Sequence, residues 1–165
     1  MNFLKVFVLG LFVFPASVLA QTAGAPKAPT DSAMDFSLAE MQQAASYLAE
    51  QGIPTRRLLE GGVFSVNVRH LEGSETALQH GRITEVWVIQ EGSGILATGG
   101  TIVNAVAGAV PGDLSGSAIE GGVEREIKAG DLVFIPTGVP HGIKQSDSIT
   151  YLNIRFEARE PDQEN

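Results

Sequence analysis

From about Arg56 to Phe156 the sequence alternates apolar and polar residues in short runs, and glycine or proline separates most runs from the next. A period of two places successive side chains on opposite faces of a β-strand. Many short strands joined by turns predict an all-β barrel or sandwich. The expected strands lie at 64–71, 85–90, 95–98, 101–103, 123–128, 132–135 and 149–156, with a tight turn at 92–94.

One N-terminal helix is expected before these strands. Ser37 and Glu40 have the spacing of a capping box, in which each side chain binds the backbone N–H of the other residue. Gly52 is placed to end the helix in a left-handed conformation. An apolar stripe at helical spacing lies between these ends: Leu38, Met41, Ala45 and Leu48. We expect this helix to pack on the sheet and to carry no chemistry.

Residues 1–20 have the layout of a secretory signal peptide. Lys5 precedes an apolar stretch at 6–14, and small residues suited to cleavage end at Ala20. We expect cleavage after Ala20 and a periplasmic or secreted protein with no membrane attachment. An uncleaved membrane anchor is the alternative, although the apolar stretch is short for a span of about 20 residues. Residues 21–35 are rich in Ala, Pro, Gly and Thr and predict a flexible linker.

A single domain at 36–157 accounts for the rest, followed by an acidic tail at 158–165. The chain has no Cys, which excludes thiolate metal ligands and a Cys nucleophile. Its net charge is −8, and without Lys5 ten basic residues face nineteen acidic ones. Such a surface repels phosphate backbones, so we expect no nucleic-acid partner.

Residues 104–122, rich in Ala, Gly and Ser, predict an insertion loop in the domain. Long loops in small domains are usually functional or mobile. The segment is therefore either a lid over a barrel mouth or a tolerated surface insertion.

Three residues form the candidate metal site: His80, Glu85 and His141. Imidazole nitrogen and carboxylate oxygen suit a divalent cation such as Fe, Mn, Ni or Zn. His80 and Glu85 flank a short turn, whereas His141 follows a stiff Pro-Thr-Gly-Val-Pro segment. Two His and one carboxylate occupy one face of an octahedron and leave positions open, as in non-haem iron(II) sites.

These residues resemble the two conserved motifs of the cupin superfamily. The motif G-x5-P-x-G-x2-H-x3-N matches at Gly130, Pro136, Gly138 and His141. The motif G-x5-H-x-H-x3-4-E-x6-G matches at His80, Glu85 and Gly92. The resemblance covers about residues 60–156. It implies a double-stranded β-helix, or jelly-roll barrel, with the metal inside, and it suggests a homodimer.

The sequence departs from these motifs at three positions. Leu78 stands where the first His is usual, Gln145 replaces the Asn, and Gly73 is one residue out of register. Cupins with four ligands use both His, so this chain would keep three. The result is either a weaker metal site with one more open position or a barrel that only binds a small molecule.

Other side chains have competing interpretations. His70 shares a strand face with Phe64, Val66 and Val68, so it is either an added catalytic base near the metal or a hydrogen-bonded core or rim residue. Arg69 and Arg82 either hold an anionic substrate or lie in solvent, and we expect solvent. Trp87 and Phe134 either pack in the core or line the pocket, and we expect the core. Glu85 should be buried, because alternation places it beside Trp87.

Two main functions follow from these expectations. The first is a metal-dependent enzyme acting on a small organic molecule, by iron(II)-dependent oxygen chemistry or by isomerase, lyase or epimerase chemistry. The second is a non-catalytic module that binds or senses a small ligand. A structural role in a larger assembly would not require the His-Glu-His set.

Overall fold

The computed structural model describes residues 26–157. The predicted signal peptide at 1–20 and its cleavage point, the start of the predicted linker and the acidic tail at 158–165 lie outside this range. Among the described residues, no helix is both long and apolar enough to cross a membrane.

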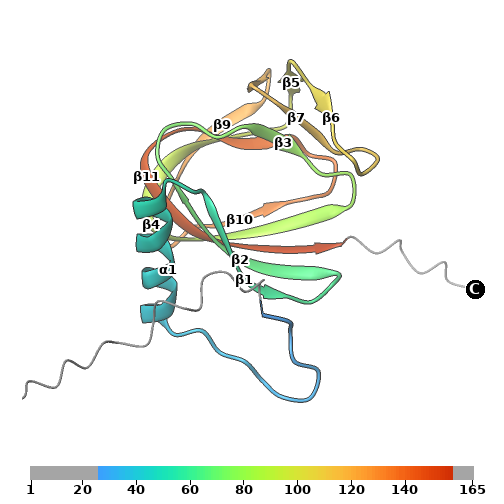
Figure 1. Cartoon of the computed structure of the whole chain (residues 1–165). Helices are drawn as coiled ribbons and strands as arrows, with labels where there is room; N and C mark the ends of the chain where they lie inside the picture. The colour runs from blue at the N-terminus through green and yellow to red at the C-terminus, as the bar shows by residue number, and fades with distance from the viewer. Residues whose placement is uncertain (1–25, 158–165) are drawn as a thin grey trace, which may run out of the picture.

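The described part contains one helix and eleven strands (Figure 1). Two long strands, β4 and β11, pair with each other along most of their length and with several shorter strands on either side. The elements in chain order are α1 (Leu38–Gln51), β1 (Thr55–Glu60), β2 (Phe64–Leu71), β3 (Ala77–Gln79), β4 (Ile83–Thr98), β5 (Thr101–Val103), β6 (Val106–Ala107), β7 (Leu114–Gly116), β8 (Ala118–Glu120), β9 (Val123–Lys128), β10 (Leu132–Ile135) and β11 (His141–Glu157).

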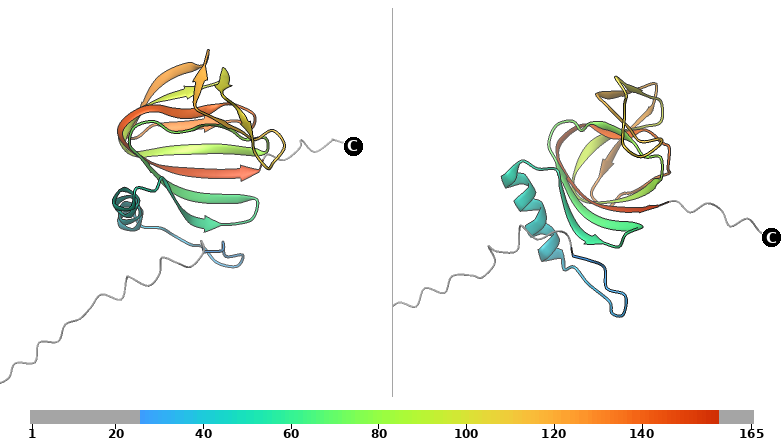
Figure 2. Two further views of the ribbon diagram at one scale, coloured as in Figure 1. Left: turned by 45° about the horizontal axis from the view of Figure 1, so that its top comes forward. Right: turned by 45° about the vertical axis from the view of Figure 1, so that its right-hand side comes forward.

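The predicted helix is confirmed at both ends. Ser37 and Glu40 form the reciprocal capping box, and Gly52 ends the helix at φ 62°. Ala45 and Leu48 are buried as predicted, but Leu38 is 60% exposed, so the stripe begins later than expected. The buried face of α1 packs on the outside of the barrel against β1 and β2 (Figure 2).

The N-terminal segment before α1 is attached to the barrel at one point. Lys27 forms a parallel bridge with Glu60, and the N–H of Ala28 donates to the Glu60 carbonyl at 2.8 Å. Residues 26–28 of the predicted linker therefore lie beside the end of β1.

The prediction of a tight turn at Gly92–Gly94 is wrong. The chain bulges there and stays within β4, because this stretch remains paired with β11 on one side and β9 on the other. Gly92 adopts φ 72°, and a Cβ atom at this position would lie 2.0 Å from the Ser148 carbonyl oxygen. Glycine is thus required for the close approach of the two long strands.

The insertion at 104–122 is not a plain loop, because β6, β7 and β8 lie within it. Strand β7 pairs with β3, and β8 pairs with β5. This region projects from the side of the barrel away from α1 (Figures 1 and 2). It therefore extends the barrel wall on the side where β3 leads into His80.

The inner face of the barrel is apolar at one end and polar at the other. Its apolar cluster contains Leu71, Trp87, Ile89, Leu96, Ile127, Val133, Ile135, Ile143, Ile149 and Tyr151. On β2 the inward residues are Ser65, Asn67, Arg69 and Leu71, so the face containing Val66, Val68 and His70 lies outside, towards α1.

Two predicted side-chain environments are wrong for the same reason. Phe134 was expected in the core but is 58% exposed, because Val133 and Ile135 take the inward positions of β10. Arg69 was expected in solvent but is half-buried on the inward face of β2, where it pairs with Glu75 at 2.6 Å. Alternation shows which residues share a face, but only closure of the barrel decides which face is inside. Trp87 is buried and Arg82 is exposed, as predicted.

Candidate metal centre

His141 is the first residue of β11 and follows the Pro-Thr-Gly-Val-Pro turn. Gly138 adopts φ 80° in this turn, and its N–H donates to the His80 carbonyl at 2.8 Å. The Nδ1 atom of His141 lies 2.9 Å from the carbonyl oxygen of Val139. The turn therefore fixes the His141 ring and also connects it to the segment that carries His80.

Glu85 lies on the inward face of β4 and is only 3% exposed. The indole N–H of Trp87 donates to its Oε2 atom at 2.7 Å, and the Asn153 amide donates to the same oxygen at 3.1 Å. These two donors hold the carboxylate in one orientation. The predicted burial of Glu85 beside Trp87 is confirmed.

His80 lies in the connection between β3 and β4, where the insertion supports it. The N–H of Gly81 donates to Oδ1 of Asp113 at 2.7 Å, and the same oxygen lies 4.0 Å from Nδ1 of His80. A Cβ atom on Gly81 would lie 2.0 Å from the Pro111 carbonyl oxygen. The insertion is thus packed directly against the residue that follows His80.

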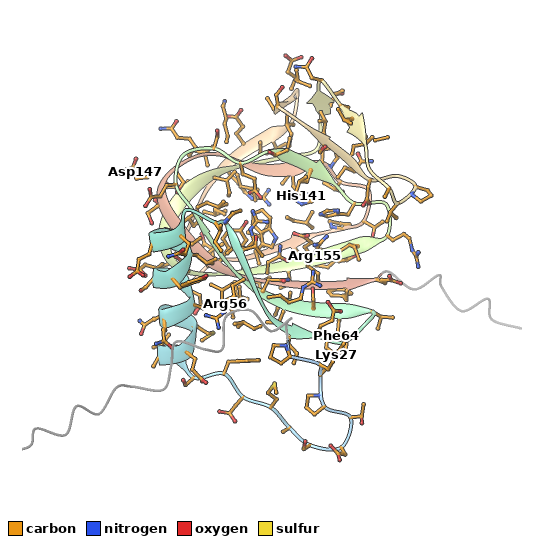
Figure 3. All side chains as sticks on the ribbon, viewed as in Figure 1. Lys27, Arg56, Phe64, His141, Asp147 and Arg155 are labelled. Atoms are coloured by element: carbon orange, nitrogen blue, oxygen red, sulfur yellow. The ribbon has the colours of Figure 1, made fainter. Side chains whose placement is uncertain are left out.

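The structure brings His80, Glu85 and His141 together. The Nε2 atom of His80 lies 3.3 Å from Oε1 of Glu85, and Nε2 of His141 lies 3.7 Å from Oε2. One potential ligand atom from each residue lies within 4.8 Å of the others, close enough for the three to hold one metal ion. Figure 3 shows His141 inside the barrel.

The protonation states of this cluster suit metal coordination. Burial raises the pKa of Glu85, but the neighbouring His80, His141, Trp87 and Arg155 groups outweigh it and lower the pKa to about 2. Burial lowers the pKa of His141, and the Glu85 carboxylate offsets only part of this effect. An ionised carboxylate and a neutral imidazole are the forms that bind a metal.

The donor set also fits a metal in its orientation. A neutral His141 that donates from Nδ1 to the Val139 carbonyl has its lone pair on Nε2, the atom that faces Glu85. Metal-ligating imidazoles commonly use one nitrogen in this way to fix the other. In addition, the buried Oδ1 atom of Asn153 has no hydrogen-bond donor among the described residues. This oxygen beside Glu85 can therefore accept a hydrogen bond from a further group in the site.

Sequence reasoning missed Arg155, which joins the cluster from β11. Its Nε atom lies 2.9 Å from Oε1 of Glu85, and one terminal guanidinium nitrogen lies 3.2 Å from Nε2 of His80. Figure 3 shows its side chain directed into the barrel. Alternation along 149–156 places Tyr151, Asn153 and Arg155 on one face, and that pattern is the signal that could have identified both polar residues.

His70 does not join the three candidate ligands. It lies on the outward face of β2, where its Nδ1 atom is 2.9 Å from Oγ1 of Thr150. Next to it is a surface cavity of about 200 Å³ lined by the end of α1 and residues 52–54. This position matches the interpretation of His70 as a hydrogen-bonded rim residue.

Comparison with known proteins finds no match in sequence but finds matches in fold. No protein-family profile matches the chain, and no curated protein matches it in sequence. Solved structures do match. A Bacillus halodurans protein is 14% identical over 78% of this chain and 85% of its own, with a TM-score of 0.53.

A Klebsiella pneumoniae protein described as having a double-stranded β-helix domain is 15% identical over 78% of this chain and 100% of its own, with a TM-score of 0.52. A Bacteroides fragilis protein described as a cupin is 18% identical over 67% of this chain and 82% of its own, with a TM-score of 0.47. At these identities the likeness concerns the fold alone. The strand pairing and the matches to the Bacillus halodurans and Klebsiella pneumoniae proteins together show that this chain has a double-stranded β-helix fold, the fold that the resemblance to cupins implies.

Proposed function

We propose that this protein is an exported, metal-dependent enzyme that acts on a small organic molecule at a mononuclear centre formed by His80, Glu85 and His141. The observation that supports this most strongly is the convergence of one ligand atom from each residue within 4.8 Å, in a buried place. A bound Fe, Mn, Ni or Zn ion would supply a Lewis acid with open positions and, for iron, a redox-active centre.

The chain's own residues have separate roles in this proposal. Trp87 and Asn153 orient the Glu85 carboxylate, and the Val139 carbonyl fixes the His141 ring. The apolar cluster of the inner face excludes water from the apolar end of the barrel. Oxygenase and isomerase or lyase reactions both agree with such a site. His70 would act as a catalytic residue only if the surface cavity beside it took part in the reaction.

A specific observation favours the alternative of a non-catalytic module that binds a small ligand. Arg155 already places a positive charge against Glu85 and His80. A guanidinium can neutralise the carboxylate and donate to the imidazole without any metal. The absence of an imidazole at Leu78 agrees with this alternative.

Elemental analysis of the protein, purified without added metal or chelating resin, tests the metal proposal. We expect about one metal ion per chain in the natural protein. The variants His80→Ala, Glu85→Gln and His141→Ala should lose it, whereas His70→Ala, a matched change on the outward face, should retain it. Metal retained in His141→Ala, or no binding of Fe, Mn, Ni or Zn by the natural protein, would contradict the proposal.

Activity separates the two functions once metal content is known. Oxygen uptake and product formation with small carbonyl and phenolic compounds would support the enzyme. A full complement of metal with no turnover on any compound would support the binding module. The mass of the exported protein tests the localisation, because cleavage after Ala20 leaves a chain that starts at Gln21.

A further inference from the structure

Arg155 occupies the point to which the candidate ligands converge. It lies directly across the β4–β11 ladder from Glu85, and its guanidinium contacts both Oε1 of Glu85 and Nε2 of His80. An arginine can only donate hydrogen bonds, so the His80 nitrogen is the acceptor. The guanidinium therefore uses the His80 lone pair that a metal ion would use, and it lies as an ion-pair partner against the Glu85 oxygen that a metal ion would bind.

A metal ion and this guanidinium position exclude each other. Both are cations, and an arginine cannot coordinate a metal. Occupation of the His80–Glu85–His141 centre thus requires Arg155 to turn away from Glu85. The side chain is 28% exposed, so it has access to the barrel mouth.

A polar cavity lies where the displaced guanidinium would go. Its volume is about 160 Å³, and it lies between the hairpin of β1 and β2, the start of β4 and the end of β11. Its lining residues are Arg57, Glu60, Gly62, Val63, Phe64, Ser65, Ile83 and Arg155. The cavity has room for a small molecule, and Arg155 belongs both to it and to the metal cluster.

Each arginine that lines this cavity has a carboxylate partner only while no metal is bound. Arg57 pairs with Glu60, and its Nε atom donates to Asn67 at 3.3 Å. Among the ion pairs of residues 26–157, Arg155 pairs with Glu85 alone. A divalent ion that takes over Glu85 leaves two added positive charges and a guanidinium without a carboxylate. A partly buried guanidinium that has lost its carboxylate partner favours the binding of an anion.

We propose that the substrate or ligand is a small carboxylate, and that Arg155 binds its carboxylate group while the rest of the molecule faces the metal. The guanidinium fork matches a carboxylate through two parallel hydrogen bonds, which a neutral amide cannot accept as well. This inference rests on the proposed metal site, because only a metal frees Arg155 from Glu85.

Calorimetric titration of the cobalt-loaded protein tests the inference, with the visible absorption of Co²⁺ as a second readout. The probes are acetate, lactate and succinate, each compared with its neutral amide. At least one carboxylate should bind about tenfold or more tightly than its amide and should change the cobalt spectrum. Arg155→Gln should remove this preference, and Arg155→Lys should restore part of it because it keeps the charge but not the fork.

Arg82→Gln is the matched control, since Arg82 is an exposed arginine that pairs with Glu157 at the same end of the barrel. It should leave the carboxylate preference unchanged. Arg155→Gln should also bind cobalt at least as tightly as the natural protein, because a competing cation is gone.

Equal affinities for all three carboxylates and their amides would overturn the inference even if Arg155→Gln failed to fold, as would an unchanged preference in a folded Arg155→Gln variant. Cobalt content, measured first, separates the two proposals. No cobalt bound would end the proposed function, whereas bound cobalt without a carboxylate preference would end only this inference.

Discussion

Leu78 lies directly across the β3–β11 ladder from His141. Paired residues in an antiparallel ladder project from the same face of the sheet, so an imidazole at position 78 would lie beside the imidazole of His141. Leu78→His should therefore add a fourth ligand and tighten metal binding by about tenfold or more. A competitive titration with a chelating dye measures this affinity.

Gln79→His is the control for that variant. Gln79 follows Leu78 in β3, and its amide donates to the Gly112 carbonyl at 3.1 Å. Adjacent strand residues project from opposite faces, so this His should leave the affinity unchanged. Equal tightening by both variants would indicate non-specific binding by an added imidazole.

Trp87→Phe should weaken metal binding by about 10- to 100-fold, because the indole N–H that orients Glu85 is lost while the stacking ring remains. Tyr151 is the matched control, since its ring stacks on Trp87 at 4.5 Å between centroids. The buried Tyr151 hydroxyl has no hydrogen-bond partner among the described residues, so Tyr151→Phe should keep the metal affinity. Similar losses in both variants would mean that ring packing, and not the N–H group, holds Glu85.

The pKa of Glu85 predicts a loss of stability in acid for the metal-free protein. Its pKa is about 2 when folded and 4.5 ordinarily, so the folded state favours the ionised form. The resulting stabilisation is present above pH 4.5 and is lost as the pH falls towards 2. It amounts to about 3 kcal/mol, at about 1.4 kcal/mol for each pKa unit. Urea unfolding at about pH 6 and about pH 3 measures the larger part of it, about 2 kcal/mol, because the rest is lost only below pH 3.

Glu85→Gln removes this titration from the folded and the unfolded states alike. Its free energy of unfolding should decrease less than that of the natural protein over the same pH range. Parallel decreases would show that other carboxylates cause the acid sensitivity.

The outer face of β10, β4 and β11 predicts a homodimer. Leu132 is 67% exposed and Phe134 is 58% exposed, although the chain is strongly acidic elsewhere. Apolar residues continue across the paired strands at Val86, Val88 and Ile154, as far as Leu152, which packs against the α1 cluster. An uncharged apolar face is where two acidic copies can approach with least repulsion. Light scattering after size-exclusion chromatography should give twice the mass of one chain.

The double variant Leu132→Gln, Phe134→Gln should be monomeric. Val106→Gln, which changes an apolar residue of the insertion that is 64% exposed, should remain dimeric. A natural protein that is monomeric at high micromolar concentration would contradict the dimer.

Local signals in the sequence predicted the parts of the fold that depend on local chemistry. The capping box of Ser37 and Glu40 and the left-handed Gly52 were identified correctly, because neighbouring backbone groups determine both. Alternation along β4 likewise placed Glu85 on the same face as Trp87, and both are buried.

The predictions that failed depend on pairing between distant strands. Gly92 resembles a turn residue until the Ser148 carbonyl is placed against it, 56 positions later in the sequence. No prediction was made for Arg155, because only the β4–β11 register shows that it lies opposite Glu85. Phe134 is apolar, but the outer side of β10 has no element over it in the described part of the chain. Alternation shows which residues share a strand face, as it does for Asn153 and Arg155, but it does not show which residues of a distant strand lie opposite them.

Asp113 supports the peptide after His80, so the insertion cannot be deleted without loosening that part of the site. One imidazole of the centre depends on residues that a sequence comparison would discard as an optional loop. A shortened version of the chain, or a related barrel without residues 104–122, would need a different anchor for that imidazole. If a variant without residues 104–122 still binds metal, then Glu85 and His141 are sufficient for binding and His80 is not needed.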